Sequence, residues 1–143
     1  MYIDTSMLAK LYLPEPESAR VQAAVAAGGN LVCAELLLAE FASVLSRKVR
    51  ERTLTPAARA RVWALFQEHV SVGAIALLPL RRPQIVKAGD ILRNLGGLVP
   101  LRAMDALHLA SCLDAAPGQH ALLTGDGIMI KAASKLDILL QSW

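Results

Sequence analysis

The chain has 143 residues, of which 55% are hydrophobic, and a formal net charge of +3. This length and composition predict one globular domain over residues 1–143 and exclude a disordered chain. Charged residues or prolines interrupt each apolar stretch before it reaches about 20 residues, so no membrane-spanning helix is expected. The opening residues have neither a basic start nor a small-residue cleavage site, so we expect a cytoplasmic protein without a secretory leader.

Short apolar segments alternate with helical patterns along the chain. In chain order, the pattern predicts a strand at residues 2–3, helices at 5–12 and 16–27, a strand at 31–33, helices at 35–50 and from 55 through 69, a strand at 75–78, helices at 83–95 and 105–113, a strand at 121–123, a helix at 128–135 and a last strand at 138–140. Pro14, Gly28-Gly29, Gly96-Gly97 and Pro117-Gly118 mark helix ends. Uniformly apolar strands of this kind predict an α/β fold whose parallel sheet is covered by helices on both faces.

The two cysteines, Cys33 and Cys112, each stand among apolar neighbours. Without a secretory context they are expected to be buried free thiols. Neither has a cysteine or histidine at zinc-binding spacing, so a structural zinc site is not expected.

Four acidic residues stand inside or at the end of apolar segments: Asp4, Glu40, Asp105 and Asp126. A buried carboxylate is unfavourable unless it finds a partner or takes up a proton. Two unit charges about 4 Å apart repel by roughly 4 kcal/mol at an effective dielectric constant near 20. Four acids that converged in a fold would need a cation, so we interpret the set as a divalent metal site.

The positions of these acids in the chain favour one common site. Asp4 and Asp126 directly follow expected strands. Asp105 begins a helix, and Glu40 lies about one and a half turns into its own. Ligands of parallel α/β sheets bind beyond the carboxyl ends of the strands, so all four acids can meet at that edge.

Each residue also has a structural interpretation. Asp4 could cap the helix that follows it, although Thr5 or Ser6 could serve instead. Asp105 is well placed to be a helix N-cap. Glu40 could lie on a solvated helix edge, and Asp126, in Thr-Gly-Asp-Gly, could belong to a turn.

The histidines are less informative than the acids. His108 could be a base or a metal ligand, but a partly buried helical histidine beside the site is the favoured interpretation. His69 and His120 have no acidic or cysteine partners in the sequence and stay unassigned.

Together these segments resemble the PIN-domain ribonucleases, most closely the VapC-type toxins of bacterial and archaeal toxin–antitoxin pairs. The resemblance covers nearly the whole chain. It depends on residues 2–6 (Tyr-Ile-Asp-Thr-Ser) with 10–12 (Lys-Leu-Tyr), 35–36 with 39–40 (Glu-Leu and Ala-Glu), 104–110 (Met-Asp-Ala-Leu-His-Leu-Ala) and 123–126 (Leu-Thr-Gly-Asp). It implies a PIN-like three-layer α/β/α fold with a short, mostly parallel central sheet.

The resemblance also implies an activity, which is metal-dependent hydrolysis of RNA. Asp4, Glu40, Asp105 and Asp126 match the family's acids in order, and Ser6 and Thr124 match its supporting hydroxyl residues. Mg²⁺ or Mn²⁺ suits such oxygen ligands. The residues expected to contact the RNA backbone are Arg102, Arg47 and Lys48, although a solvated helix end explains the last two equally well.

The partners implied by the resemblance are an RNA substrate, a cognate small antitoxin and a second copy of the chain. The expected assembly is a homodimer that forms a heterotetramer or a larger complex with the antitoxin. A candidate groove for the antitoxin is formed by Leu8, Leu11, Tyr12, Phe41 and Leu45, for which a role in the core is equally expected.

Three other functions remain open at this stage. The first is a PIN-like RNA-processing nuclease without an antitoxin, and the second is a non-catalytic RNA- or protein-binding module. The third is a metal-dependent phosphohydrolase of small molecules, although the sequence contains no phosphate-binding glycine loop.

Overall fold

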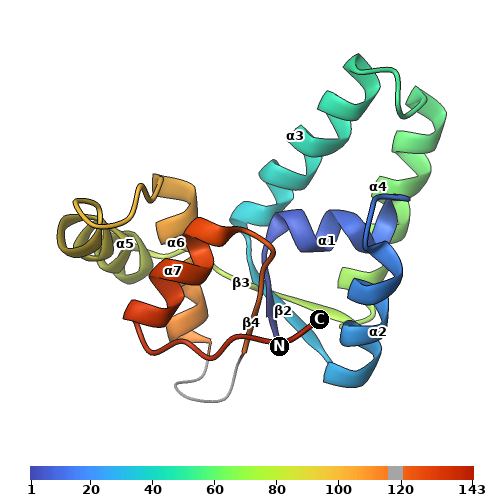
Figure 1. The fold of residues 1–143 in the computed structure, drawn as a ribbon. Helices are drawn as coiled ribbons and strands as arrows, with labels where there is room; N and C mark the ends of the chain where they lie inside the picture. The colour runs from blue at the N-terminus through green and yellow to red at the C-terminus, as the bar shows by residue number, and fades with distance from the viewer. Residues whose placement is uncertain (116–120) are drawn as a thin grey trace.

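The computed structural model describes residues 1–115 and 121–143 (Figure 1). Each strand in these ranges is followed by one or two helices, in the order predicted from the sequence. The elements are β1 (Tyr2–Ile3), α1 (Thr5–Tyr12), α2 (Ser18–Gly28), β2 (Leu31–Ala34), α3 (Leu36–Arg50), α4 (Pro56–Ser71), β3 (Ile75–Leu78), α5 (Arg82–Leu95), α6 (Ala103–Asp114), β4 (Leu122–Leu123) and α7 (Gly127–Lys135). The predicted helix-end signal Pro117-Gly118 and the unassigned His120 lie outside the described residues.

The four strands form one parallel sheet in the order β3-β2-β1-β4. The N-terminal strand β1 therefore lies between β2 and β4, and Tyr2 is paired with Val32 on one side and Leu122 on the other. Because the strands run in the same direction, their carboxyl ends meet at one edge of the sheet. The residues that follow β1 and β4 are neighbours there, and the Asp4 N–H donates to the Leu123 carbonyl at 3.3 Å.

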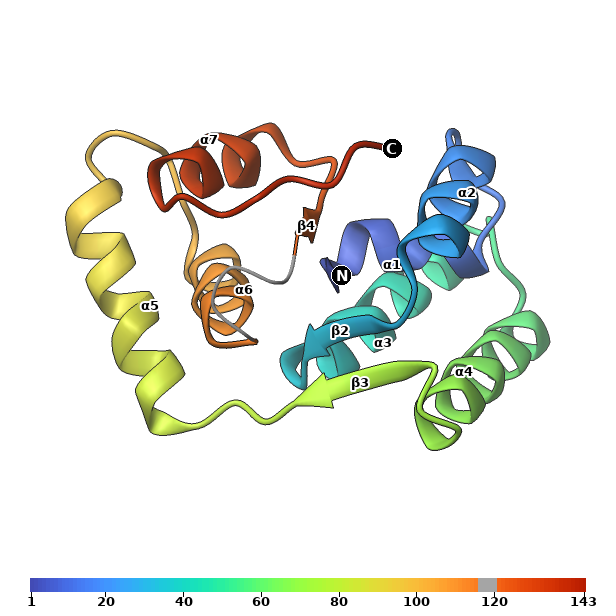
Figure 2. The ribbon, with the colours of Figure 1, turned by 90° about the horizontal axis from the view of Figure 1, so that it is seen from below.

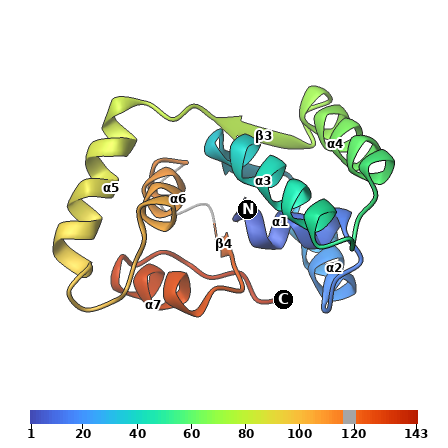
Figure 3. The same ribbon diagram turned by 90° about the horizontal axis from the view of Figure 1, so that it is seen from above.

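Helices cover both faces of this sheet, as the sequence predicts (Figures 2 and 3). Helices α5, α6 and α7 lie on one side and α1 to α4 on the other, and each group closes a separate apolar core. Figure 1 also shows α3 and α4 continuing side by side beyond the sheet as a projecting arm. The result is a three-layer α/β/α arrangement.

The strand side chains alternate between the two cores. Tyr2 and Leu122 belong to the core beneath α5, α6 and α7, whereas Ile3 and Leu123 belong to the core beneath α1 to α4. Successive side chains of a strand point to opposite faces, so a two-residue strand contributes one side chain to each core. This arrangement explains why the strands are apolar throughout.

Three of the differences from the predicted boundaries bear on the fold or the site. Helix α2 begins at Ser18 and not at Pro16, because Glu17 has a left-handed φ of 72° that a helix cannot include. Helix α6 begins at Ala103, which makes Asp105 its third residue. The predicted last strand is reduced to a single parallel bridge between Leu122 and Leu140.

The predicted antitoxin groove on the first helices is wrong. Leu8, Phe41 and Leu45 expose 1% of their surface or less, and they belong to the core beneath α1 to α4. Leu11 and Tyr12 are partly buried against the same core. The amphipathic faces of α1 and α3 pack on each other and on α4, where Phe41 and Phe66 meet edge to face at 5.2 Å, so they are not available to a partner.

Both cysteines are buried free thiols, as predicted. Burial raises the pKa of Cys33 and of Cys112 to about 12, so both thiols are protonated at neutral pH. Within the described ranges, no helix has the length and apolar character needed to cross a membrane.

Candidate active site

The four acids singled out in the sequence line one cleft at the carboxyl edge of the sheet. The cleft has a volume of about 620 Å³. It is lined by Asp4, Thr5, Ser6, Ala9, Lys10, Glu15, Ala39, Glu40, Ser43, Val44, Arg47, Met104, Asp105, His108, Asp126 and Met129. Elements that are distant in the chain thus bring the carboxylates around one common space.

Asp4 is the most deeply buried of these acids, with 3% of its surface exposed. Its Oδ1 atom accepts hydrogen bonds from the Met7 N–H and the Ser6 hydroxyl, both at 2.8 Å, and thereby caps helix α1. Of the three possible caps that the sequence offers, Asp4 is the one used, because the hydroxyl groups of Thr5 and Ser6 donate to Glu40 and Asp4. The helix N-terminus and these donors stabilise a negative charge on Asp4.

Thr124 connects two of the acids. Its hydroxyl donates to Asp4 Oδ2 and accepts a hydrogen bond from the Asp126 N–H at 3.1 Å. Asp126 in turn caps helix α7, because its Oδ1 atom accepts from the Ile128 and Met129 N–H groups at 2.6 and 3.0 Å. The buried Thr124 hydroxyl therefore links Asp4, which follows β1, to Asp126, which follows β4.

Glu40 is half-buried on α3 and faces the cleft, which contradicts a simple solvated edge. Its Oε2 atom accepts a hydrogen bond from the Thr5 hydroxyl and lies 2.7 Å from His108 Nε2. Burial by itself raises the pKa of Glu40, but the interactions with His108 and Thr5 outweigh burial and lower it overall. Glu40 is therefore ionised at neutral pH.

His108 is completely enclosed beside this acid, with 3% of its surface exposed. Its Nδ1 atom lies 2.9 Å from the Tyr2 hydroxyl oxygen, which also accepts a hydrogen bond from the Ala34 N–H at 3.2 Å. Both ring nitrogens are thus engaged by protein groups, which argues against His108 as a metal ligand. The sequence analysis missed the Tyr2 contact, although a buried tyrosine hydroxyl needs a partner.

Asp105 does not cap helix α6, contrary to the interpretation of this residue as an N-cap. It is the third residue of the helix, and its Oδ2 atom accepts a hydrogen bond from the Arg102 N–H at 3.1 Å. Burial raises the pKa of Asp105, and the negative charge of Asp126 raises it further against the opposing effects of Arg102 and His108. Asp105 and Asp126 are therefore close enough to repel each other.

The carboxylate oxygens around the cleft are suitable ligands for a hard divalent cation. Among the described residues, no hydrogen bond is made to Glu40 Oε1, Asp105 Oδ1 or Asp126 Oδ2, and such oxygens are the ligands that Mg²⁺ and Mn²⁺ prefer. A cation would also relieve the repulsion between Asp105 and Asp126.

The carboxylates do not form a closed cage. Within residues 1–115 and 121–143, no group of three or more potential ligands is gathered closely enough to hold a metal ion. Each acid accepts hydrogen bonds from protein groups: a helix N-terminus for Asp4 and for Asp126, Thr5 with His108 for Glu40, and the Arg102 N–H for Asp105. The four carboxylates would therefore have to move closer together to share a bound ion.

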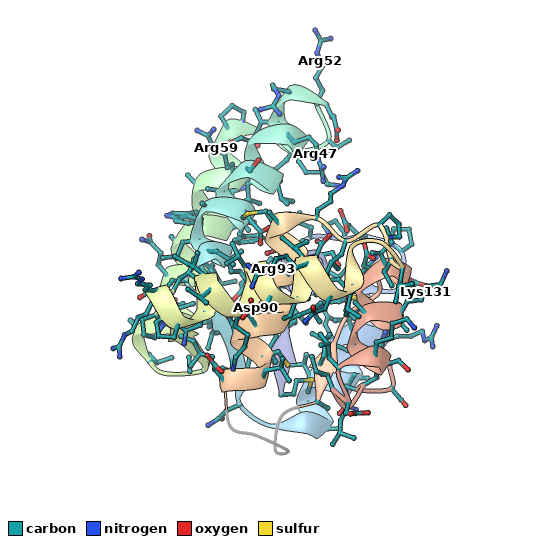
Figure 4. The ribbon with its side chains drawn as sticks, turned by 90° about the vertical axis from the view of Figure 1, so that its left-hand side faces the viewer. Arg47, Arg52, Arg59, Asp90, Arg93 and Lys131 are labelled. Atoms are coloured by element: carbon teal, nitrogen blue, oxygen red, sulfur yellow. The ribbon has the colours of Figure 1, made fainter. Side chains whose placement is uncertain are left out.

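The three basic residues predicted to contact RNA occupy different surroundings. Arg47 lines the cleft on the α3–α4 arm, and Figure 4 shows it on the same arm as Arg52 and Arg59. Lys48 is paired with Glu15 at 2.5 Å, so its charge is partly neutralised. Arg102 is exposed immediately before α6. Only Arg47 among these three lines the cleft.

The profile of the PIN domain matches the sequence over residues 1–135. The chain belongs to the PIN-domain family. PIN domains are generally nucleases and are typically dependent on divalent metals, which agrees with an acidic cleft at the sheet edge. No curated protein matches the sequence of this PIN domain.

Two solved structures share the PIN fold of this chain. The structure of VapBC2 from Rickettsia felis, bound to a DNA fragment from their promoter, has a TM-score of 0.68 and 14% identity over 99% of this chain and 97% of that chain. The structure of FitAcB from Neisseria gonorrhoeae has a TM-score of 0.66 and 16% identity over 99% of this chain and 96% of that chain. At these identities the likeness concerns the fold.

Proposed function

We propose that this PIN domain is a metal-dependent endoribonuclease and the toxin component of a type II toxin–antitoxin pair. The observation that carries the proposal is the convergence of Asp4, Glu40, Asp105 and Asp126 on one cleft. Carboxylates of this number in one space suit hydrolysis of a phosphodiester bond with a bound Mg²⁺ or Mn²⁺ ion.

Three of the acids, Asp4, Glu40 and Asp105, would hold the ion, and Asp126 would complete the site. The ion, when bound, lowers the pKa of a coordinated water and offsets the charge of the transition state. Ser6 and Thr124 would act by fixing the position of the Asp4 carboxylate.

A nucleic-acid strand suits the charges of the cleft, and RNA is the strand that the sequence resemblance indicates. Arg47 lies in the cleft with its side chain 57% exposed, where it can reach a phosphate of a bound strand. Aromatic residues make up 4% of the chain, and three of the six, Tyr2, Phe41 and Phe66, are fully buried. Stacking on bases is therefore limited, and recognition through the shape of the RNA is expected.

The proposed partners are a small antitoxin and a second copy of the chain, in a heterotetramer or larger complex. Support comes from the fold shared with the VapBC2 and FitAcB structures and from the sequence resemblance to VapC-type toxins. The antitoxin surface lies outside the Leu8, Phe41 and Leu45 cluster, because that cluster is the core.

The test is cleavage of labelled RNA by the purified protein with Mg²⁺ or Mn²⁺. Asp4→Asn and Asp105→Asn should each lower the rate about 100-fold or more, and a chelator should stop it. Asp90→Asn is the matched control, because Asp90 pairs with Arg93 on the outer face of α5, away from the cleft (Figure 4). Cleavage that continued in both cleft variants would refute the assignment.

The same preparation distinguishes the alternative functions. A non-catalytic module would bind RNA without cutting it, and a small-molecule phosphohydrolase would hydrolyse a simple phosphate ester in place of RNA. An antitoxin reading frame beside this gene, whose product blocks cleavage, would separate the toxin from an RNA-processing nuclease.

A further inference from the structure

Tyr2 and His108 form a series of buried hydrogen bonds, and neither residue has a role in the chemistry proposed above. Tyr2 has no exposed surface, and His108 exposes 3%. This series of hydrogen bonds connects the Ala34 N–H, the Tyr2 hydroxyl, the His108 ring and the Glu40 carboxylate. A buried polar network that links strand β1, helix α6 and helix α3 at this point orders one side of the cleft.

The groups at the two ends of this series determine which atom donates in each hydrogen bond. The Ala34 amide can only donate, so the Tyr2 oxygen accepts from it at 3.2 Å and has one hydrogen left to give. In the neutral ring, that hydrogen is donated to His108 Nδ1 at 2.9 Å, which is then the unprotonated nitrogen. The ring proton of neutral His108 is therefore on Nε2, from which it donates to Glu40 Oε2 at 2.7 Å.

The opposite tautomer would place two acceptors against each other. With the proton on Nδ1, the bare Nε2 atom would face a carboxylate oxygen at 2.7 Å. The Tyr2 hydroxyl hydrogen would then lose Nδ1 as its acceptor, and the Tyr2 oxygen would face the Nδ1 proton as well as the Ala34 N–H. The surroundings of the ring thus select a single tautomer.

We propose that His108, held as the Nε2–H tautomer by Tyr2, is a positioning residue that fixes the Glu40 carboxylate. His108 and Thr5 together occupy Oε2, which leaves Oε1 as the oxygen that Glu40 offers to a cation. This consequence for cation binding depends on the proposed function. The Tyr2–His108 arrangement itself depends only on the contacts described above.

Binding of Mn²⁺ in the absence of RNA, measured by calorimetry, tests the inference independently of catalysis. Tyr2→Phe and His108→Leu should weaken Mn²⁺ binding about 10–100-fold, as loss of a hydrogen bond that orients a metal ligand does. His108→Gln can place an amide N–H near the position of Nε2, so it should bind Mn²⁺ more tightly than His108→Leu. With RNA, the variants should lower kcat and leave KM nearly unchanged.

The protein contains a matched control for the tyrosine–histidine pair. The Tyr12 hydroxyl lies 2.7 Å from His69 Nδ1, outside the cleft. Tyr12→Phe therefore removes a similar hydrogen bond without touching an acid of the site. It should leave Mn²⁺ affinity unchanged, which separates positioning of Glu40 from general loss of stability.

The ¹⁵N chemical shifts of the imidazole rings provide the second measurement. Wild-type His108 should show a protonated Nε2 and a bare Nδ1, and Tyr2→Phe should give a mixture of tautomers. A protonated Nδ1 in the wild-type protein, or wild-type Mn²⁺ affinity in both Tyr2→Phe and His108→Leu, would overturn the inference. A wild-type protein that neither binds Mn²⁺ nor cleaves RNA would overturn the proposed function, and the ¹⁵N shifts would then decide separately whether His108 holds Glu40.

Discussion

Replacing Thr124 by valine tests the bridge between the two strand-end acids. Thr124 exposes 3% of its surface, and its hydroxyl donates to Asp4 and accepts from the Asp126 N–H. Valine has nearly the same shape but no hydroxyl. The substitution therefore removes both hydrogen bonds, leaves the Asp126 N–H without its partner and keeps the packing.

The size of the effect follows from these two bonds. A hydrogen bond to a charged group contributes about 1.5–3 kcal/mol and a neutral one about 0.5–1.5 kcal/mol. Thr124→Val should therefore lower the free energy of unfolding by about 2–4 kcal/mol. Thr124→Ser keeps the hydroxyl and removes one methyl group, so it should cost only about 1 kcal/mol.

Urea denaturation followed by circular dichroism measures this difference. For an m-value near 2 kcal/mol/M, Thr124→Val should lower the midpoint by roughly 1–2 M and Thr124→Ser by about 0.5 M. RNA cleavage should fall more in the valine variant, because Asp4 loses a donor and the Asp126 loop loses its link to β1. Equal midpoints for the two variants would show that the hydroxyl does not bridge the acids.

Three other changes test the electrostatics and the core. At pH 7, Asp105→Asn should raise stability, because the pKa of Asp105 lies above its ordinary value of 3.8; this gain should vanish as the pH falls through the raised pKa. Glu40→Gln should lower stability at pH 7, because the pKa of Glu40 lies below its ordinary value of 4.5; this loss should disappear as the pH falls through the lowered pKa. Thermal melts from pH 3 to 8 measure both, and the same sign for the two variants at pH 7 would contradict the pKa directions. Phe41→Ala should cost about 3–5 kcal/mol in urea melts, since Phe41 is fully buried; a cost below 1 kcal/mol would contradict its place in the core.

Much of the cleft could be predicted because three of its acids follow strands or lie on the helix that leaves a strand. Asp4 comes directly after β1 and Asp126 three residues after β4, so parallel pairing brings both to one edge. Glu40 stands on the helix that follows β2, on a flank rich in leucine. The useful signal in the sequence was an acid surrounded by apolar residues, because a carboxylate in an apolar environment needs a partner.

The hydrogen-bond partners could not be predicted in the same way. Tyr2 and His108 are 106 residues apart, and no periodicity relates a strand residue to a position on a distant helix. The cap of α1 also depended on a distant residue, because the Thr5 hydroxyl donates to Glu40, 35 residues away, and Asp4 accepts from the Met7 N–H. The groove prediction for Leu8 and Phe41 was wrong because an apolar helix face has the same sequence pattern whether it meets a partner or a neighbouring helix.

The central position of β1 in the sheet determines how much of the chain must be synthesised before the cleft can form. This strand precedes the other three in the chain, yet its two neighbours in the sheet are β2 and β4. Asp4 acquires its Thr124 donor only after 120 further residues have been made. A chain that has been synthesised only as far as α6 therefore has no assembled cleft, and the cleft can form only after β4 has emerged from the ribosome.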